Sequence, residues 1–192
     1  MIKIQLPVTA DKIRELKAGD EVAITGVMIT GRDTAHKYLV ETGGEDVKEL
    51  LKNSMIYHCG PVVKKEGDSY SFVAAGPTTS IREEPYQGKV IESYGVRGVI
   101  GKGGMGKGTM EACKKFGAVY FHAVGGCGTS TAVAVKEVQG VHKLEEFGTP
   151  EAFWVIRTED FPVIVTMDTH GESIHDQVDA ESRKVLDELL KA

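Results

Sequence analysis

Two threonines and one arginine follow a predicted strand in residues 76–82, whose sequence is Gly-Pro-Thr-Thr-Ser-Ile-Arg. The apolar run 70–75 is typical of a strand, and Gly-Pro ends it by turning the backbone. Proteins of the α/β class place their chemistry at strand ends. The hydroxyls of Thr78 and Thr79 and the planar fork of Arg82 suit a carboxylate or a phosphate, because the fork can donate two parallel hydrogen bonds. The alternative is that both threonines are only turn and cap residues.

Two further cations lie after predicted strands. Arg32 follows the β-branched run 21–29, and Lys102 lies in the glycine-rich loop 101–108. Arg32 near a helix start indicates a bound anion or an acidic partner, and the loop glycines let backbone N–H groups approach an anion. The alternatives are a surface Arg–Asp pair and a solvated lysine. The loop nearly matches a P-loop, but Gly108 stands where Ser or Thr would reach magnesium, so a nucleotide is not favoured. The three cations instead suit a small dicarboxylate.

Length and charge exclude several classes of protein. A chain of 192 residues predicts one domain, here residues 1–192. Lys and Arg number 23 and Asp and Glu 28, so the net charge is −5, and without a basic cluster nucleic-acid binding is not expected. No apolar run approaches the ~20 residues that span a bilayer, and the N-terminus lacks the pattern of a signal peptide. We therefore expect a cytoplasmic protein.

The cysteines and histidines do not predict a metal site in this chain. Cys59, Cys113 and Cys127 are an odd number of cysteines with wide spacing, which does not suggest a disulfide framework and differs from the clustered spacing of common iron–sulfur sites. We expect all three to be small buried apolar side chains. His170 and His175 are five residues apart rather than the four of a His-Glu-x-x-His zinc site.

Alternating apolar runs and helical patterns predict one α/β domain with mixed strands. The expected strands are 2–6, 21–29, 55–58, 70–75, 98–100, 118–124, 153–157 and 163–167, and the expected helices are 11–16, 33–40, 45–52, 109–116 and 173–191. Residues 62–70 read as a charged connector, and 129–138 fits either helix or strand. The last two strands flank a Pro-containing segment and predict a hairpin or a sharp reversal. The final helix is amphipathic, with an apolar face made by Val178, Val185, Leu186, Leu189 and Leu190.

Three motifs together resemble a known family. They are Gly31-Arg32-Asp33-x-Ala35-His36-Lys37, Gly76-Pro77-Thr78-Thr79-x-x-Arg82 and Gly101-Lys102-Gly103-Gly104-Met105, followed by Trp154 and by Asp160-Phe161-Pro162-Val163. In this order they resemble the β subunit of the class I, iron–sulfur-dependent fumarate hydratases and of the L-tartrate dehydratases. The same unit is the C-terminal domain where the two halves are fused. The resemblance spans nearly the whole chain.

The resemblance implies a fold, a cofactor and a partner. The fold of that family is a swivelling β/β/α domain, in agreement with the mixed α/β reading. Its [4Fe–4S] cluster is held by three cysteines of a separate α subunit, and the cysteines of this chain do not match those ligands. We therefore expect a hetero-oligomer with an α subunit and no activity without it.

The resemblance also implies roles for four residues. Thr78 matches the proposed catalytic base, and Arg32, Arg82 and Lys102 match the residues that grip the substrate carboxylates. The implied activity is the reversible hydration of fumarate to (S)-malate. A free threonine hydroxyl is a weak base, so Thr78 needs activation by a neighbouring charge or acts as a proton relay. The alternatives are an L-tartrate dehydratase subunit and a dicarboxylate-binding module without catalysis.

Overall fold

The structure is a computed structural model that describes residues 1–191. Its strands are β1 (Ile2–Gln5), β2 (Glu21–Thr30), β3 (Met55–Tyr57), β4 (Val62–Glu66), β5 (Ser69–Ala74), β6 (Gly98–Gly101), β7 (Val119–His122), β8 (Val135–His142) and β9 (Phe153–Met167). Its helices are α1 (Ala10–Arg14), α2 (Asp33–Glu41), α3 (Lys48–Leu51), the 3-10 helix η1 (Ser80–Glu83), α4 (Glu84–Tyr94), α5 (Lys107–Phe116), α6 (Gly128–Val133), α7 (Leu144–Phe147) and α8 (Ile174–Leu189). The expected mixed α/β class, mixed sheet and C-terminal helix are confirmed.

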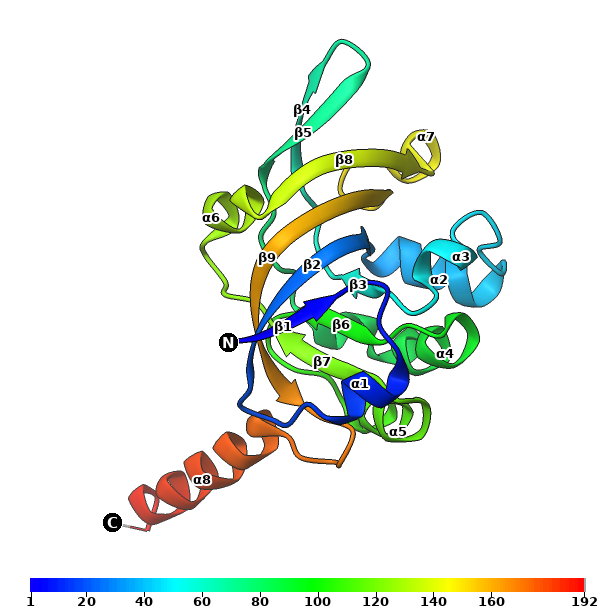
Figure 1. The fold of residues 1–192 in the computed structure, drawn as a ribbon. Helices are drawn as coiled ribbons and strands as arrows, with labels where there is room; N and C mark the ends of the chain where they lie inside the picture. The colour runs from blue at the N-terminus through cyan, green and yellow to red at the C-terminus, as the bar shows by residue number, and fades with distance from the viewer. Residues whose placement is uncertain (192) are drawn as a thin grey trace.

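Seven strands form one mixed sheet in the order β1-β2-β3-β6-β7-β9-β8 (Figure 1). The pairs β2–β3, β3–β6 and β6–β7 are parallel, so these strands end at a common edge. The antiparallel strand β9 pairs with β7 and also with β2, which closes the sheet on itself. Closure fixes how the parallel strands are placed relative to one another, and with them the segments that follow each strand.

Alternate side chains of each strand enter two different cores, as the pleat of a strand requires. Met55 and Tyr57 pack in a core inside the closed sheet, while Ile56 between them packs in a second core with residues of α2, α3, α4 and α5. Phe121 and Tyr120 of β7 divide in the same way. Figure 1 shows these four helices gathered on one side of the sheet. Both faces of the parallel strands are therefore buried, and only their ends are open for chemistry.

Three sequence-based expectations are wrong or incomplete. The connector predicted at 62–70 is instead the start of the hairpin β4–β5, which turns at Gly67. The reversal predicted near Pro162 does not occur, because β9 runs on as one 15-residue strand. Asp160 takes a positive φ of 46° and donates its N–H to Thr25 Oγ1, so the chain bends without turning back. The ambiguous segment 129–138 divides between α6 and β8.

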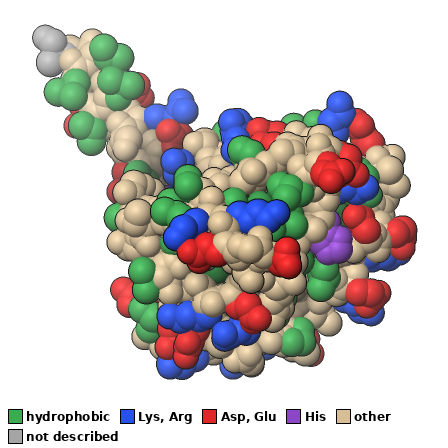
Figure 2. All heavy atoms as spheres, turned by 90° about the horizontal axis from the view of Figure 1, so that it is seen from above, with side chains coloured by type: hydrophobic (Ala, Val, Ile, Leu, Met, Phe, Trp, Pro, Cys, Tyr) green, Lys and Arg blue, Asp and Glu red, His purple; other side chains and the backbone are tan. Residues whose placement is uncertain are grey.

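Helix α8 projects away from the rest of the molecule (Figures 1 and 2). Ser173 caps it by accepting the N–H of Asp176. None of its residues is buried, and the predicted apolar face is more than half exposed at each position, namely Val178, Val185, Leu186, Leu189 and Leu190. The pattern thus predicted the helix correctly, but no part of the described chain covers its apolar face. Within residues 1–191, no helix has the length and apolar composition that crossing a bilayer requires.

The cysteine expectation is correct for two of the three side chains. Cys59 and Cys113 are buried and free, while Cys127 is exposed. Cys127 lies at the start of the short helix α6, in a glycine-rich loop that contributes no apolar surface to either core.

Candidate active site

The predicted segment 76–82 crosses the ends of β3 and β6. The N–H of Thr78 donates to the carbonyl of His58 at 2.7 Å, and the N–H of Lys102 donates to the carbonyl of Thr78 at 3.2 Å. The N–H of Ser80 returns a bond to the carbonyl of Lys102 at 3.0 Å. Thr78 and Lys102 are therefore fixed side by side at the carboxyl edge of the parallel strands, which is where α/β proteins bind ligands.

Arg32 follows β2 at the same edge. Gly31 next to it donates its N–H to the carbonyl of Tyr57 at 2.9 Å, which joins the ends of β2 and β3. The guanidinium Nε of Arg32 lies 3.3 Å from Glu151 Oε1. It also lies against the backbone after β3, since a Cβ built on Gly60 would stand 2.5 Å from Arg32 Nη1. The glycine at position 60 therefore makes room for this side chain.

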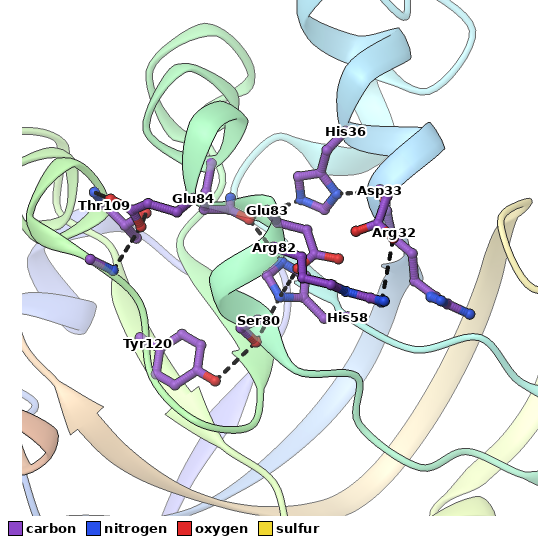
Figure 3. A network of polar contacts seen from close by, with 12 residues as sticks. Arg32, Asp33, His36, His58, Ser80, Arg82, Glu83, Glu84, Thr109 and Tyr120 are labelled. Atoms are coloured by element: carbon purple, nitrogen blue, oxygen red, sulfur yellow. Dashed lines mark hydrogen bonds and ion pairs between the residues drawn. The ribbon is translucent and has the colours of Figure 1, made fainter.

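Arg82 reaches the first turn of α2 from η1. Its Nη2 lies 3.4 Å from Asp33 Oδ2, and its side chain is 47% exposed. Asp33 is the residue directly after Arg32, so Arg82 is paired with the neighbour of Arg32 at the start of α2 (Figure 3). Lys102 points toward the loop after β7, because a Cβ on Gly125 would stand 3.5 Å from Lys102 Cδ. The structure thus brings the four predicted positions to one edge of the sheet.

A buried polar network, which no pattern in the sequence predicted, lies behind this edge (Figure 3). The imidazole of His58 bridges Ser80 Oγ, 2.8 Å from Nδ1, and the side-chain amide of Gln87, 2.8 Å from Nε2. The same amide lies 2.9 Å from His36 Nε2, and Tyr120 donates its hydroxyl to Ser80 Oγ at 3.0 Å. The network joins β3, η1, α4, α2 and β7, so it holds segment 76–82 against the sheet.

Burial makes the two imidazoles neutral, and their hydrogen-bond partners fix which ring nitrogen of each carries the proton. Burial lowers the pKa of His36 and, together with the neighbouring His36 ring, lowers the pKa of His58 well below its ordinary value, so both rings are neutral. His36 Nδ1 donates to the carbonyl of Arg32 at 2.8 Å, which leaves His36 Nε2 as an acceptor. Gln87 must therefore donate from its NH2 group to Nε2 of both rings. Because Nε2 of His58 is then an acceptor, the single ring proton of His58 lies on Nδ1, where it faces Ser80.

The N-terminus of α5 is already occupied by a carboxylate of this chain. Glu84 accepts the N–H of Gly106 at 2.8 Å, the N–H of Thr109 at 3.1 Å and the Thr109 hydroxyl at 2.7 Å. The expectation that N–H groups at this helix start receive an external anion is therefore wrong. In the glycine-rich loop, Lys102 is left as the cation that faces the edge of the sheet.

The sequence of the whole chain agrees with this geometry. Residues 1–178 match the family model described as the fumarase C-terminus. The chain belongs to this family. It is 48% identical over 190 residues to a protein of Geobacillus stearothermophilus named as a class I fumarate hydratase, covering 98% of this chain and 36% of that protein. It thus spans about a third of that relative. The β subunit of L(+)-tartrate dehydratase from Escherichia coli is 39% identical over 183 residues, covering 95% of this chain and 88% of the relative.

A protein of Methanocaldococcus jannaschii named for the same tartrate dehydratase subunit is 39% identical over 185 residues, covering 95% of both chains. Relatives named for two activities therefore match this unit, so membership of the family does not by itself separate the two activities.

The residues of this chain do not fit the ligand set of an iron–sulfur cluster. Across residues 1–191, no group of three or more His, Cys, Asp or Glu side chains is arranged to hold a metal ion. Burial raises the pKa of the Cys59 and Cys113 thiols to about 12 each, which disfavours the thiolate that an iron atom needs.

Proposed function

We propose that this chain is the β subunit of a class I fumarate hydratase, a hydro-lyase that interconverts fumarate and (S)-malate together with an α subunit. The observation that carries the proposal is the pair of backbone hydrogen bonds that fix Thr78 beside Lys102, with Arg32 and Arg82 at the same edge of the sheet. The 48% identity to the Geobacillus protein named as a fumarate hydratase supports fumarate as the substrate.

In this proposal the three cations bind and orient the two carboxylates of the substrate. Arg82 adds a substrate carboxylate to its contact with Asp33, which its partial exposure and its remaining N–H donors allow, while Arg32 stays held by Glu151. Thr78 moves the proton on the carbon next to a carboxylate. Negative charge then develops on that carboxylate, and the fixed cations stabilise it most strongly where water is excluded.

The iron–sulfur cluster belongs to the α subunit in this proposal, because the residues of this chain do not fit it. We assign to this chain only binding, orientation and the proton movement at Thr78. We further propose that residues 1–192 act as one domain, and the cytoplasm stays our prediction for its location.

L-tartrate dehydratase is the second candidate, and one observation favours it. The Escherichia coli protein named as a β subunit matches 95% of this chain and is matched over 88% of its own length, so nearly all of that subunit corresponds to this sequence. Both substrates are four-carbon dicarboxylates, which the same cations can bind. Turnover of a panel containing fumarate, (S)-malate and L-tartrate separates the two candidates.

The test is co-expression with the α partner, anaerobic reconstitution of the complex and measurement of fumarate hydration. Thr78→Ala should lower kcat by about 100-fold or more, as expected for a lost acid–base group. Thr42→Ala, at an exposed position at the end of α2, is the control and should keep wild-type turnover. No turnover of any dicarboxylate by the reconstituted complex would refute the function, and near-normal turnover of Thr78→Ala would remove Thr78 from the chemistry.

A further inference from the structure

Glu83 is a fully buried carboxyl group next to the arginine that the proposed function places on the substrate. Its side chain is 0% exposed, and neither of its oxygens has a hydrogen-bond donor. Oδ1 of Asp33 is likewise buried without a donor. Buried polar atoms normally have partners, so three such oxygens in one place need an explanation.

The surrounding groups do not supply the missing donor. His58 Nδ1 is 4.0 Å from Glu83 Oε2, beyond hydrogen-bonding distance, and its proton faces Ser80. Arg82 contacts the other oxygen of Asp33, Oδ2, at 3.4 Å. His36 is neutral and bonded to the carbonyl of Arg32.

The raised pKa of Glu83 agrees with a carboxyl group that keeps its proton at neutral pH. Burial first, and then the hydrogen bond to Asp33 and the negative charge of Asp33, raise the pKa of Glu83 to about 8, against the opposing effects of the nearby backbone N–H of Glu83 itself and of the Arg82 guanidinium. The charged and titratable groups around Glu83 are Asp33 and His36 of α2, Arg82 of η1, His58 after β3 and Tyr120 of β7 (Figure 3). The pKa of Tyr120 is itself raised, mainly by burial, so this hydroxyl brings no charge.

We propose that Glu83 is a positioning residue that carries a proton and donates it to Asp33 Oδ1, so that Asp33 Oδ2 holds the guanidinium of Arg82 ready for a substrate carboxylate. One added proton supplies a partner to Asp33 Oδ1 and removes an unpaired charge from the protein interior. The consequence for catalysis rests on the proposed function, whereas the protonation itself does not.

Loss of this proton weakens dicarboxylate binding. With a pKa of about 8, Glu83 is ionised in about a tenth of the molecules at pH 7 and in about nine tenths at pH 9. Ionised Glu83 repels the Asp33 carboxylate that holds Arg82. It also adds a second negative charge next to Arg82, which opposes the binding of a substrate carboxylate there. We therefore expect the KM for the dicarboxylate to rise between pH 7 and pH 9 on the order of three- to tenfold.

Infrared difference spectroscopy of the full chain tests the protonation without any turnover. The carbonyl stretching band of a protonated carboxylic acid should persist at pH 7, where exposed carboxyl groups are ionised, and should titrate away near pH 8. Glu83→Gln should remove this band, and Glu92→Gln, at an exposed position of α4, should keep it. Asp33→Asn should lower the midpoint of the titration, because it removes the charge that raises the pKa.

Kinetics of the reconstituted complex test the positioning role. Glu83→Gln keeps a neutral donor of similar shape, so its KM should no longer rise between pH 7 and pH 9, while wild type and Glu92→Gln should keep the rise. Absence of the carboxylic acid band in wild type overturns the proposal whether or not the complex turns over. A present band with the same KM profile in wild type and Glu83→Gln overturns the positioning role and leaves the proposed function intact. If Glu83→Gln does not fold, Asp33→Asn tests the same proton, because it should lower the pH at which the carboxylic acid band of Glu83 disappears.

Discussion

Replacing Gly101 by alanine should disrupt the link between η1 and the sheet. Gly101 ends β6, and a Cβ there would stand 1.8 Å from Ser80 Oγ and 3.2 Å from His58 Nδ1. The backbone cannot shift easily, because Ala123 donates its N–H to the carbonyl of Gly101 at 2.8 Å. Ser80 must therefore move away from the network.

The magnitude follows from the bonds that Ser80 makes. Moving Ser80 breaks the 2.8 Å contact with His58 and the 3.0 Å bond from Tyr120, and both of these side chains are buried. Each broken bond that leaves a buried group without a partner costs about 1–3 kcal/mol. We expect Gly101→Ala to lower the free energy of unfolding by about 2–6 kcal/mol, measured by urea unfolding of the full chain.

A double-mutant cycle identifies the contact responsible. Ser80→Gly removes the atoms that the new methyl group would overlap, so Gly101→Ala should cost much less in the Ser80→Gly background than in wild type. Gly140→Ala is the control, because a Cβ at that position meets no atom within 4 Å, and it should change stability by no more than about 0.5 kcal/mol. If Gly101→Ala and Gly140→Ala prove equally mild, the placement of Ser80 against the end of β6 is wrong.

Three further changes test other parts of the structure. Arg82→Lys should lower kcat/KM about tenfold or more, because a point charge cannot replace the fork, and an unchanged value would deny this residue a carboxylate contact. The pKa of His58 is depressed in the folded protein, so as the pH falls below about 6.5 the unfolded chain takes up a proton at this ring before the folded chain does. Urea unfolding at each pH should therefore show that wild type loses stability toward pH 5 more steeply than His58→Asn, by up to about 1.4 kcal/mol per pH unit. Equal slopes would contradict the burial of His58 as a neutral ring. Truncation after Gln177 should change the free energy of unfolding by less than about 1 kcal/mol, because α8 has no buried residue, and a larger loss would show that the helix packs on the body.

The edge that carries the candidate site could be predicted from sequence because it depends on local rules. Apolar runs followed by Gly31, Gly76 and Gly101 mark strand ends, and parallel strand ends meet at one edge. The positions of Arg32 and Lys102 follow from that rule. Thr78 and Arg82 instead follow β5 of the separate antiparallel hairpin, and their segment reaches the edge through the backbone bonds of Thr78 to His58 and Lys102. Their roles in binding and catalysis stay predictions.

The network behind the edge could not be predicted in the same way. No element was expected between residues 82 and 98, where α4 lies, because Gly88 and several polar residues interrupt its apolar pattern. Pro85 in its first turn and Gly95 as its left-handed C-cap were the available signals for the helix. Nothing in the local pattern marks Glu83 and Gln87 as buried, because their burial comes from the packing of η1 and α4 against α2 and the end of β3.

Strand β9 shows a second limit of local patterns. Pro162 has no N–H and usually indicates a strand end or an edge strand. Here it pairs with Ala23 of β2 within a strand that also pairs with β7 and β8. The irregular register between Ile24 and Gly26 absorbs the bend. The reversal was predicted because the pairing of Pro162 with β2, which lets the strand continue through the proline, cannot be read from the sequence of β9 alone.

The exposure of the cations bears on how the site works as a whole. Arg82 is 47% exposed, so in the isolated chain its attraction for a carboxylate is screened by water. Two charges 4 Å apart attract by about 1 kcal/mol in bulk water but by about 4 kcal/mol near a protein surface of lower dielectric. A partner subunit that covers this edge would strengthen each of these contacts. Calorimetry should therefore show weak or no dicarboxylate binding by the isolated chain and clear binding by the complex, whereas tight binding by the isolated chain would favour a stand-alone dicarboxylate-binding module.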